Sequence, residues 1–322
     1  MKRKTINKIL DNKFEEWCAS IEDTNLRELV RKNTIITGGA IASMLLNEPV
    51  NDYDVYFRTW ETNRAVAEYY LARFSPKNRN GIPCSISLVD ADTNLDPVKG
   101  NRIKIVIKSA GIASEDGAQK DYQYFEFRPE GEASHYVSEV MRDAGEIEDT
   151  YDQVEQGVLQ SQDDDGKPAY RPVFMSSNAI TLSQKIQIVI RFWGDPEELH
   201  ENYDFVHCTN YWTSWDRKVE LKPDAMEALL SKELRYVGSK YPLCSIMRLR
   251  KFIKRGWSVN AGQILKAIMQ LNALDLLDPK VLEDQLTGVD SAYFAEVIQK
   301  LSERNPEKIE TAYLIEIIDR MF

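Results

Sequence analysis

The sequence predicts an α+β protein with a mixed β-sheet and flanking helices, enlarged by extra strands and followed by an all-helical C-terminal domain. Three observations predict this class. Strand and helix patterns alternate over residues 6–74, and from residue 82 the apolar period changes to two. After Pro223 the apolar residues recur with helical spacing only. The sheet is therefore expected in the first two thirds of the chain.

The N-terminal part begins with two helical patterns, Ile6–Ile21 and Asn25–Lys32. Residues 35–57 then predict a short apolar strand, a glycine pair, an amphipathic helix, a turn and a second strand. Another amphipathic helix is expected over Glu61–Phe74. This order of elements is typical of an α/β unit that carries an active site.

The extra strands are predicted by segments of period two that are separated by polar turns. They cover Pro83–Val89, Arg102–Ile107, Tyr122–Phe127, Arg171–Met175, Ala179–Leu182 and Ile186–Phe192. A further strand is expected over Asn202–Trp212, which is rich in β-favouring residues. Residues 145–167 hold many carboxylates and few large apolar side chains, which favours a solvated loop over an acidic metal site.

The remaining patterns are helical and are joined by short turns. They cover Asp224–Leu234, Ser245–Arg255, Ala261–Leu271, Pro279–Leu286, Ser291–Arg304 and Lys308–Met321. We therefore expect N-terminal helices packed on a central catalytic domain, and then a helical domain, over residues 1–33, 34–220 and 221–322.

Composition excludes several classes of protein. The chain has 41 Lys and Arg against 51 Asp and Glu, a net charge of −10, which argues against non-specific coating of nucleic acid. The four cysteines are far apart and form no CxxC pair, so neither a zinc site nor a disulfide framework is indicated and we expect reduced, mostly buried thiols. No secretory signal and no apolar run of membrane-spanning length is found, so a soluble, cytoplasmic protein without membrane contact is expected.

The strongest chemical pattern lies in residues 35–57. Asp52 and Asp54 are two residues apart on a predicted strand, so their carboxylates point the same way, about 6 to 7 Å apart along the strand. This spacing suits a shared pair of divalent cations. Gly38 and Gly39 fall where the next helix begins, and a glycine turn there presents backbone N–H groups to a phosphate. The pattern indicates phosphoryl or nucleotidyl transfer.

Two-cation phosphoryl transfer usually needs a third carboxylate. Asp204, in a strongly β-favouring segment, is the candidate, and Glu126 and Asp90 are its competitors because both lie in or beside predicted strands. His207 is close to Asp204 in sequence, and we expect it to be packed or hydrogen-bonded rather than catalytic.

The segment Gly38-Gly-Ala-Ile-Ala-Ser-Met-Leu-Leu-Asn-Glu-Pro-Val-Asn-Asp-Tyr-Asp-Val55 resembles the signature of the polymerase-β-type nucleotidyltransferase superfamily. Its spacing is similar to that of the tRNA nucleotidyltransferase (CCA-adding) and poly(A) polymerase branch. That pattern is Gly-Gly-x-Val-Arg-Asp-x-Leu-Leu-Gly, four residues, then Asp-x-Asp. The family's Arg-Asp is replaced by Ala42-Ser43 here, and its motif for choosing CTP and ATP is not recognisable.

A second segment, Tyr241–Trp257, is similar to the family's Arg-x-x-Arg-Phe-x-x-Arg-x-Gly-Phe motif, with a lysine at one arginine position and a shorter final spacing. Independently of any family, Arg248, Lys251 and Arg255 lie at i, i+3 and i+7 and share one helix face. Such a face can hold a triphosphate or an RNA backbone. A solvated or salt-bridged face is the alternative.

The resemblance implies a Mg²⁺-dependent nucleotidyltransferase (EC 2.7.7 type) that transfers NMP from a nucleoside triphosphate such as ATP to a hydroxyl. It implies an RNA 3′ end, similar to tRNA, as acceptor, with a protein or a small molecule as the alternative. A non-catalytic nucleotide-binding module is a further hypothesis. In another, the glycines and acids are only a turn and a strand pair in an unrelated α/β protein. The implied ligands of two Mg²⁺ ions are Asp52, Asp54 and Asp204, and the implied nucleotide contacts are Thr37, Gly38, Gly39, Ser43, Arg248, Lys251 and Arg255.

Overall fold

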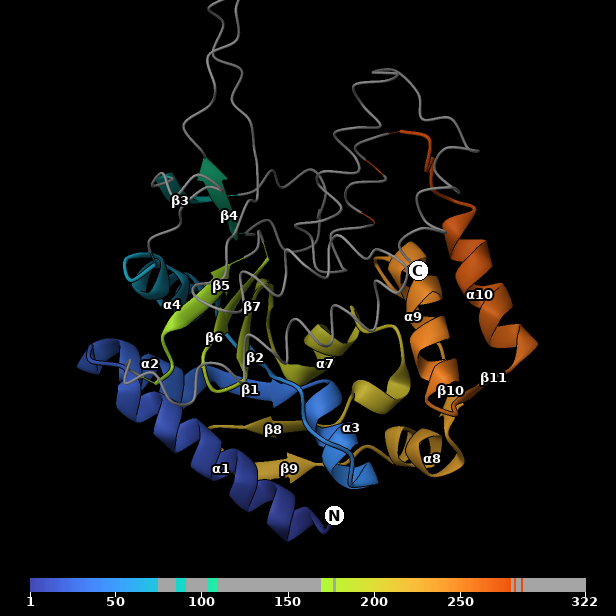
Figure 1. Ribbon diagram of the computed structural model, residues 1–322, viewed down its shortest axis with the longest axis horizontal. Coiled ribbons are helices and arrows are strands. Elements are labelled where there is room, and N and C mark those ends of the chain that lie inside the picture. Colours follow the sequence, from blue (N-terminus) through green and yellow to red (C-terminus); the bar gives the residue numbers. More distant parts are fainter. Residues whose placement is uncertain are drawn as a thin grey trace, which may run out of the picture. The chain divides into compact units, whose positions relative to one another are not determined.

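The computed structural model describes residues 1–74, 85–90, 103–108, 169–175 and 178–278, together with Val281 and Gln285 (Figure 1). The chain forms two compact units, Met1–Glu68 with Lys185–Asp275, and Tyr69–Gln184 with Leu276–Phe322. The predicted strand over residues 122–127, the loop over 145–167 and the predicted helices after residue 290 lie outside the described residues, as does most of the predicted helix 279–286.

The first unit contains a mixed sheet whose strands have the order β7-β2-β1-β8-β9. The strands are β1 (Thr34–Thr37), β2 (Tyr53–Phe57), β7 (Ile186–Trp193), β8 (Tyr211–Thr213) and β9 (Lys218–Glu220). β1 is antiparallel to both β2 and β8, and β8 is antiparallel to β9, whereas β2 and β7 are parallel. The predicted fold class, a mixed sheet with flanking helices, is confirmed.

Helix α1 (Arg3–Ser20) covers one face of this sheet, and α2 (Thr24–Asn33) follows it (Figure 1). Five residues of α1 recur at helical spacing and are fully buried: Ile6, Leu10, Phe14, Trp17 and Cys18. Phe14 lies 5.1 Å from Trp212 on β8, and Trp17 lies 6.4 Å from Phe57 on β2, measured between ring centroids. The sequence pattern of α1 therefore attaches it to the middle of the sheet.

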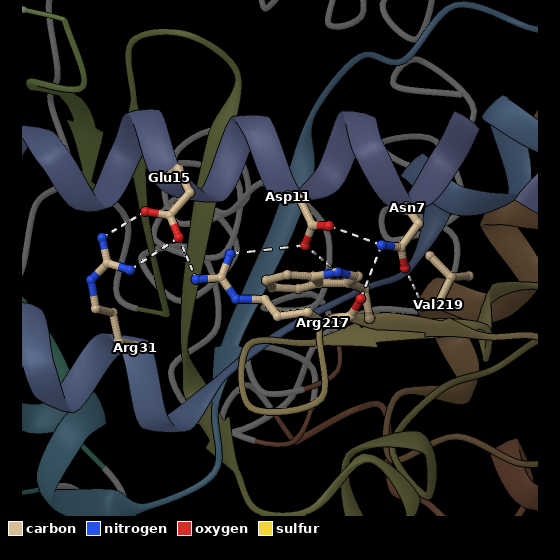
Figure 2. Close-up of polar contacts among 7 residues, drawn as sticks. Asn7, Asp11, Glu15, Arg31, Arg217 and Val219 are labelled. Carbon is tan, nitrogen blue, oxygen red and sulfur yellow. Dashed lines mark hydrogen bonds and ion pairs between the residues drawn. The ribbon is translucent and has the colours of Figure 1, made fainter. Parts of the chain in front are cut away.

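Polar side chains join α1 to the turn between β8 and β9 (Figure 2). The Arg217 guanidinium pairs with Glu15, lies 3.9 Å from the Asp11 carboxylate and 4.9 Å from the centroid of the Phe14 ring. The Asn7 amide donates to the Arg217 carbonyl (2.9 Å). Glu15 is also held by Arg31 on α2 through two hydrogen bonds. The network thus connects both N-terminal helices to the far edge of the sheet.

Replacing Arg217 with methionine is expected to lower the free energy of unfolding by about 1 kcal/mol, because the side chains are partly exposed and Glu15 keeps Arg31. Urea unfolding of the variant beside the wild type measures the loss. Lys218→Met, at an exposed neighbouring position, is the matched control. Equal stability of the two variants would show that the network contributes nothing.

After the sheet, the first unit continues with three helices and a small pair of parallel strands. They are α8 (Pro223–Ser231), β10 (Glu233–Leu234), α9 (Pro242–Lys254), β11 (Ser258–Val259) and α10 (Ala261–Leu271). Their shared core includes Phe205, Leu234, Tyr236 and Trp257. The predicted boundary near residue 221 therefore falls inside the first unit.

In its described residues, the second unit contains two antiparallel strand pairs. β3 (Ser85–Asp90) pairs with β4 (Ile103–Lys108), and β5 (Pro172–Met175) pairs with β6 (Ala179–Leu182). All four strands match predicted segments to within two residues at each end. Helix α4 (Trp60–Leu71), also predicted, ends in this unit. Within the described ranges, no helix has the length and apolarity needed to cross a membrane.

The predicted strand over Asn202–Trp212 is wrong for most of its length. Only its last residues join the sheet, as β8, and a 3-10 helix occupies Val206–Cys208. The Asp204 carboxylate accepts a hydrogen bond from the N–H of Phe205 (3.0 Å), and the Thr209 hydroxyl donates to the carbonyl of Val206 (2.7 Å). Such local side-chain to backbone bonds compete with a strand ladder, so β propensity alone is misleading here.

Candidate active site

The acid pair lies beside the centre of the sheet. Asp54 on β2 is the register partner of Thr37 on β1 and of Gln187 on β7, and Asp52 immediately precedes β2. With its nitrogen toward the acids, the Gln187 amide donates to Asp54 Oδ1 (3.0 Å) and Asp52 Oδ2 (3.1 Å). Both carboxylates therefore converge on one atom of the neighbouring strand. All three side chains are half-buried.

Gly38 is the residue that lets Asp54 reach the start of α3 (Gly39–Leu46). It has φ 90° and ψ −151°, a conformation that essentially only glycine adopts. A Cβ atom at this position would lie 2.4 Å from Asp54 Oδ2. The carboxylate of Asp54 thus lies against the N-terminus of α3, where the helix dipole favours negative charge.

The two glycines have different surroundings. The Gly38 N–H donates to the carbonyl of Cys208 (3.2 Å). This amide was predicted to face a phosphate, but it is engaged within the protein. At Gly39, by contrast, a Cβ atom would meet nothing within 4 Å. Ser43, four residues further along α3, is half-buried and lies on the same side of the helix. Open space at this end of the helix is therefore found at Gly39.

Thr37 has a structural environment that the sequence did not indicate. Its side chain is fully buried, donates to the carbonyl of Asn210 (2.9 Å) and lies 2.9 Å from His200 Nε2. Lys222 Nζ lies 3.0 Å from His200 Nδ1. Because an ammonium group only donates, His200 Nδ1 accepts and its Nε2–H donates to Thr37. Burial, and then Lys222, lowers the pKa of His200 to about 3, so it is neutral.

Asp204 is paired with a cation of the predicted basic face. Arg248 Nη1 donates to Asp204 Oδ2 (2.7 Å), and the Asp204 side chain is only 11% exposed. In the part of the chain that the structure describes, no three His, Cys, Asp or Glu side chains converge to hold a metal ion. The structure therefore does not bring Asp204 into a ligand set with the acid pair. Its competitor Glu126 lies outside the described residues, and Asp90 ends β3 in the second unit.

One of the three cations of the predicted basic face is held in an ion pair within the protein. Arg248 and Lys251 lie on α9, and Arg255 is the residue that follows its end. Arg248 is joined to Asp204, whereas Lys251 is half-buried and Arg255 is exposed. The three cations of this face therefore differ in burial, and Arg248 is already engaged in an ion pair.

His207 is a packed side chain, as predicted. It is 2% exposed, and its ring lies 4.4 Å from Trp257, 4.9 Å from Phe252 and 6.0 Å from Phe205, between centroids. Burial lowers the pKa of His207 to about 4, although the nearby Asp204 carboxylate opposes the shift. It is therefore neutral in the folded protein near pH 7.

The two buried histidines predict a loss of stability in weak acid. Their pKa values fall from 6.5 to about 4 for His207 and about 3 for His200, so the unfolded chain binds these protons first. The free energy of unfolding should fall as the pH drops through this range. Urea unfolding at about pH 7 and pH 5 measures the change. His207→Phe should reduce it, and an unchanged pH dependence in that variant would contradict the assignment.

Comparisons with known proteins match a family profile and distant solved structures. A profile of the Gabija anti-defense 2 family matches residues 8–232. A CCA-adding enzyme of Bacillus stearothermophilus in complex with CTP is similar at 11% identity and a TM-score of 0.35, over 79% of this chain and 44% of that chain. A Thermotoga maritima CCA-adding enzyme complexed with tRNA is similar at 12% identity and a TM-score of 0.36, over 92% and 57%.

This chain thus spans about half the length of those two enzymes. No curated protein matches it significantly.

Proposed function

We propose that this chain, which belongs to the Gabija anti-defense 2 family, counteracts the Gabija defence as a divalent-cation-dependent nucleotidyltransferase. One observation carries the proposed chemistry. The Asp54 carboxylate lies against Gly38 at the start of α3, and Asp52 shares its contact with Gln187. Two acids beside a helix N-terminus can hold a cation and the phosphates that the cation bridges.

The donor set suits Mg²⁺. Asp52 and Asp54 supply carboxylate oxygens, which hard divalent cations prefer, and the half-buried setting strengthens the attraction. Bound there, Mg²⁺ would neutralise phosphate charge and lower the pKa of the attacking hydroxyl. Asp52 and Asp54 would hold the cation, and Gly38 would keep Asp54 in place.

The triphosphate would bind at the first turn of α3. The first N–H groups of a helix have no partner within the helix and carry partial positive charge. Since Gly38 donates to Cys208, the amides from Gly39 onward would serve, in the open space at Gly39. The Ser43 hydroxyl and the cations Lys251 and Arg255 are the proposed further contacts.

We propose a protein hydroxyl as the acceptor. The net charge of −10 disfavours binding of RNA along its backbone, and Arg248 already pairs with Asp204. The hydroxyl would release its proton to solvent, its oxygen would bond to the α-phosphorus, the bond from that phosphorus to the bridging oxygen would break, and pyrophosphate would leave. An RNA 3′ end is the second candidate because of the cations at the end of α9.

Labelling tests this proposal. The protein is incubated with Mg²⁺, each α-³²P-labelled nucleoside triphosphate and lysate of cells that carry the Gabija defence. We expect Mg²⁺-dependent label that protease removes and ribonuclease does not. Label removed by ribonuclease would establish RNA as the acceptor instead. Absence of label with every triphosphate would overturn the enzymatic proposal and favour a non-catalytic nucleotide-binding module.

A further inference from the structure

The side chain of Gln187 is the neutral group that contacts both acids of the pair. Gln187 lies on β7, which runs parallel to β2 and beside it, and it is the register partner of Asp54. Among the described residues, no third His, Cys, Asp or Glu completes a metal site with Asp52 and Asp54. We propose that Gln187 is the positioning residue of the acid pair and sets how strongly the pair binds a divalent cation. This inference rests on the proposed function of the site.

The contacts of Gln187 support this role. One amide nitrogen reaches both carboxylates, at 3.0 and 3.1 Å, so a single side chain fixes the direction of two acids. Hydrogen bonds from a donor to ionised acceptors are strong, and here they offset the repulsion between two like charges. The amide oxygen of the same side chain can serve as a ligand for a hard cation. The amide nitrogen of Gln187 thus serves the acid pair when no cation is bound, and its amide oxygen can serve when a cation is bound.

The composition of β7 also points to Gln187. The residues on the opposite face of the strand, Ile186, Ile188 and Ile190, are buried in the apolar core. Val189, the next residue on the face of Gln187, packs in a second apolar cluster. A glutamine in this apolar run is costly to bury unless its polar atoms are bonded, and the acids supply that bonding.

Lys185, which precedes β7, holds the segment on either side of Asp52. The Lys185 carbonyl accepts from the N–H of Tyr53 (2.7 Å), and Lys185 Nζ donates to the carbonyl of Val50 (3.1 Å). These bonds fix the segment that carries Asp52 to the chain just before β7. Lys185 and Gln187 therefore place both acids relative to β7.

The charge of the site follows from the amide. Two carboxylates and a neutral amide carry two negative charges, whereas three carboxylates would carry three. Because ligand charge tunes cation affinity, a glutamate at this position should bind a divalent cation more tightly. A methionine of similar length should leave the acids without their shared donor and should bind the cation more weakly.

Mn²⁺ binding to the full chain tests the inference, measured by calorimetry without nucleotide. We expect Gln187→Met to weaken Mn²⁺ binding by about 10- to 100-fold, the effect of losing a supporting partner of a metal ligand. Gln187→Glu should strengthen binding by at least about 10-fold through the added charge. The control is Gln263→Met on α10, because the Gln263 side chain instead accepts from the N–H of Tyr236 (2.9 Å).

The outcomes separate this inference from the proposed function. If the wild type binds Mn²⁺ and transfers label but Gln187→Met or Gln187→Glu binds Mn²⁺ like the control, only the role of Gln187 is wrong. If the wild type neither binds Mn²⁺ nor transfers label, the proposed function itself fails. Opposite changes in the two Gln187 variants, with an unchanged control, would support the inference.

Discussion

Replacing Asp54 with asparagine should abolish nucleotidyl transfer and leave the fold intact. The substitution removes one of the two charges that hold the cation and keeps the size of the side chain beside Gly38. We expect a loss of roughly 10²- to 10³-fold or more, the effect of removing one preorganised electrostatic group from an active site. Incorporation of α-label measures it.

Stability and a remote variant complete this test. The free energy of unfolding of Asp54→Asn should stay within about 1 kcal/mol of the wild type, because relief of the repulsion between the two carboxylates offsets the weaker bond to Gln187 and the lost attraction of the helix dipole. Glu28→Gln, an exposed acid on α2, is the matched control and should transfer label normally. Turnover retained in Asp54→Asn would remove this residue from the chemistry.

Replacing Gly38 with alanine has the second largest expected effect. The methyl group would lie 2.4 Å from Asp54 Oδ2, and φ 90° with ψ −151° is strained for any residue with a Cβ. The strain alone should cost about 1–3 kcal/mol of stability. The displaced carboxylate should lower transfer of α-label nearly as far as loss of Asp54 does. Urea unfolding and the labelling assay measure the two effects.

Substitutions at two other glycines separate the effect of backbone strain from the effect of the steric contact with Asp54. Gly256 also has positive φ, at 80°, but an added Cβ would meet nothing within 4 Å. Gly256→Ala should therefore lose stability while keeping activity. Gly39→Ala has neither positive φ nor a close neighbour and should keep the stability of the wild type. If Gly38→Ala retains full activity, the contact between Gly38 and Asp54 does not position the acid.

Periodicity predicted most of the fold because the elements bury regular apolar faces. Segment Ala261–Leu271 was predicted with the bounds that α10 has, and the same holds for Ala179–Leu182 and β6. The prediction of a strand over residues 202–212 is wrong because Asp204 and Thr209 form local side-chain to backbone hydrogen bonds that compete with strand pairing. Propensity averages over such bonds and does not detect them.

The arrangement of the candidate site was predictable where its residues are close in sequence. Gly38, Gly39, Asp52 and Asp54 lie in one strand-helix-strand unit, whose short connections bring them together. The long-range partners were not predictable. His200 meets Thr37 across 163 positions, and no spacing rule links residues so far apart. A weak signal for Gln187 was that it is one of two polar residues, with Arg191, in the largely apolar strand Ile186–Trp193.

The role of Asp204 shows the same limit. A buried carboxylate in a β-favouring segment needs a partner, and Asp204 has one. A bound metal cation and an ion pair with a basic side chain satisfy that need equally well, and the sequence does not distinguish them. The structure gives the partner as Arg248, 44 positions away. The pairing also removes one cation from the face that was predicted for phosphate.

The most direct test of the central claim compares α-³²P- and γ-³²P-labelled nucleoside triphosphates in the same reaction with lysate and Mg²⁺. Nucleotidyl transfer at the Gly38, Asp52 and Asp54 site predicts that the acceptor keeps the α label and never the γ label, because pyrophosphate leaves. The label should disappear when both aspartates are replaced by asparagine. Acceptor labelled from the γ position, or α label that persists in the double variant, would contradict the account.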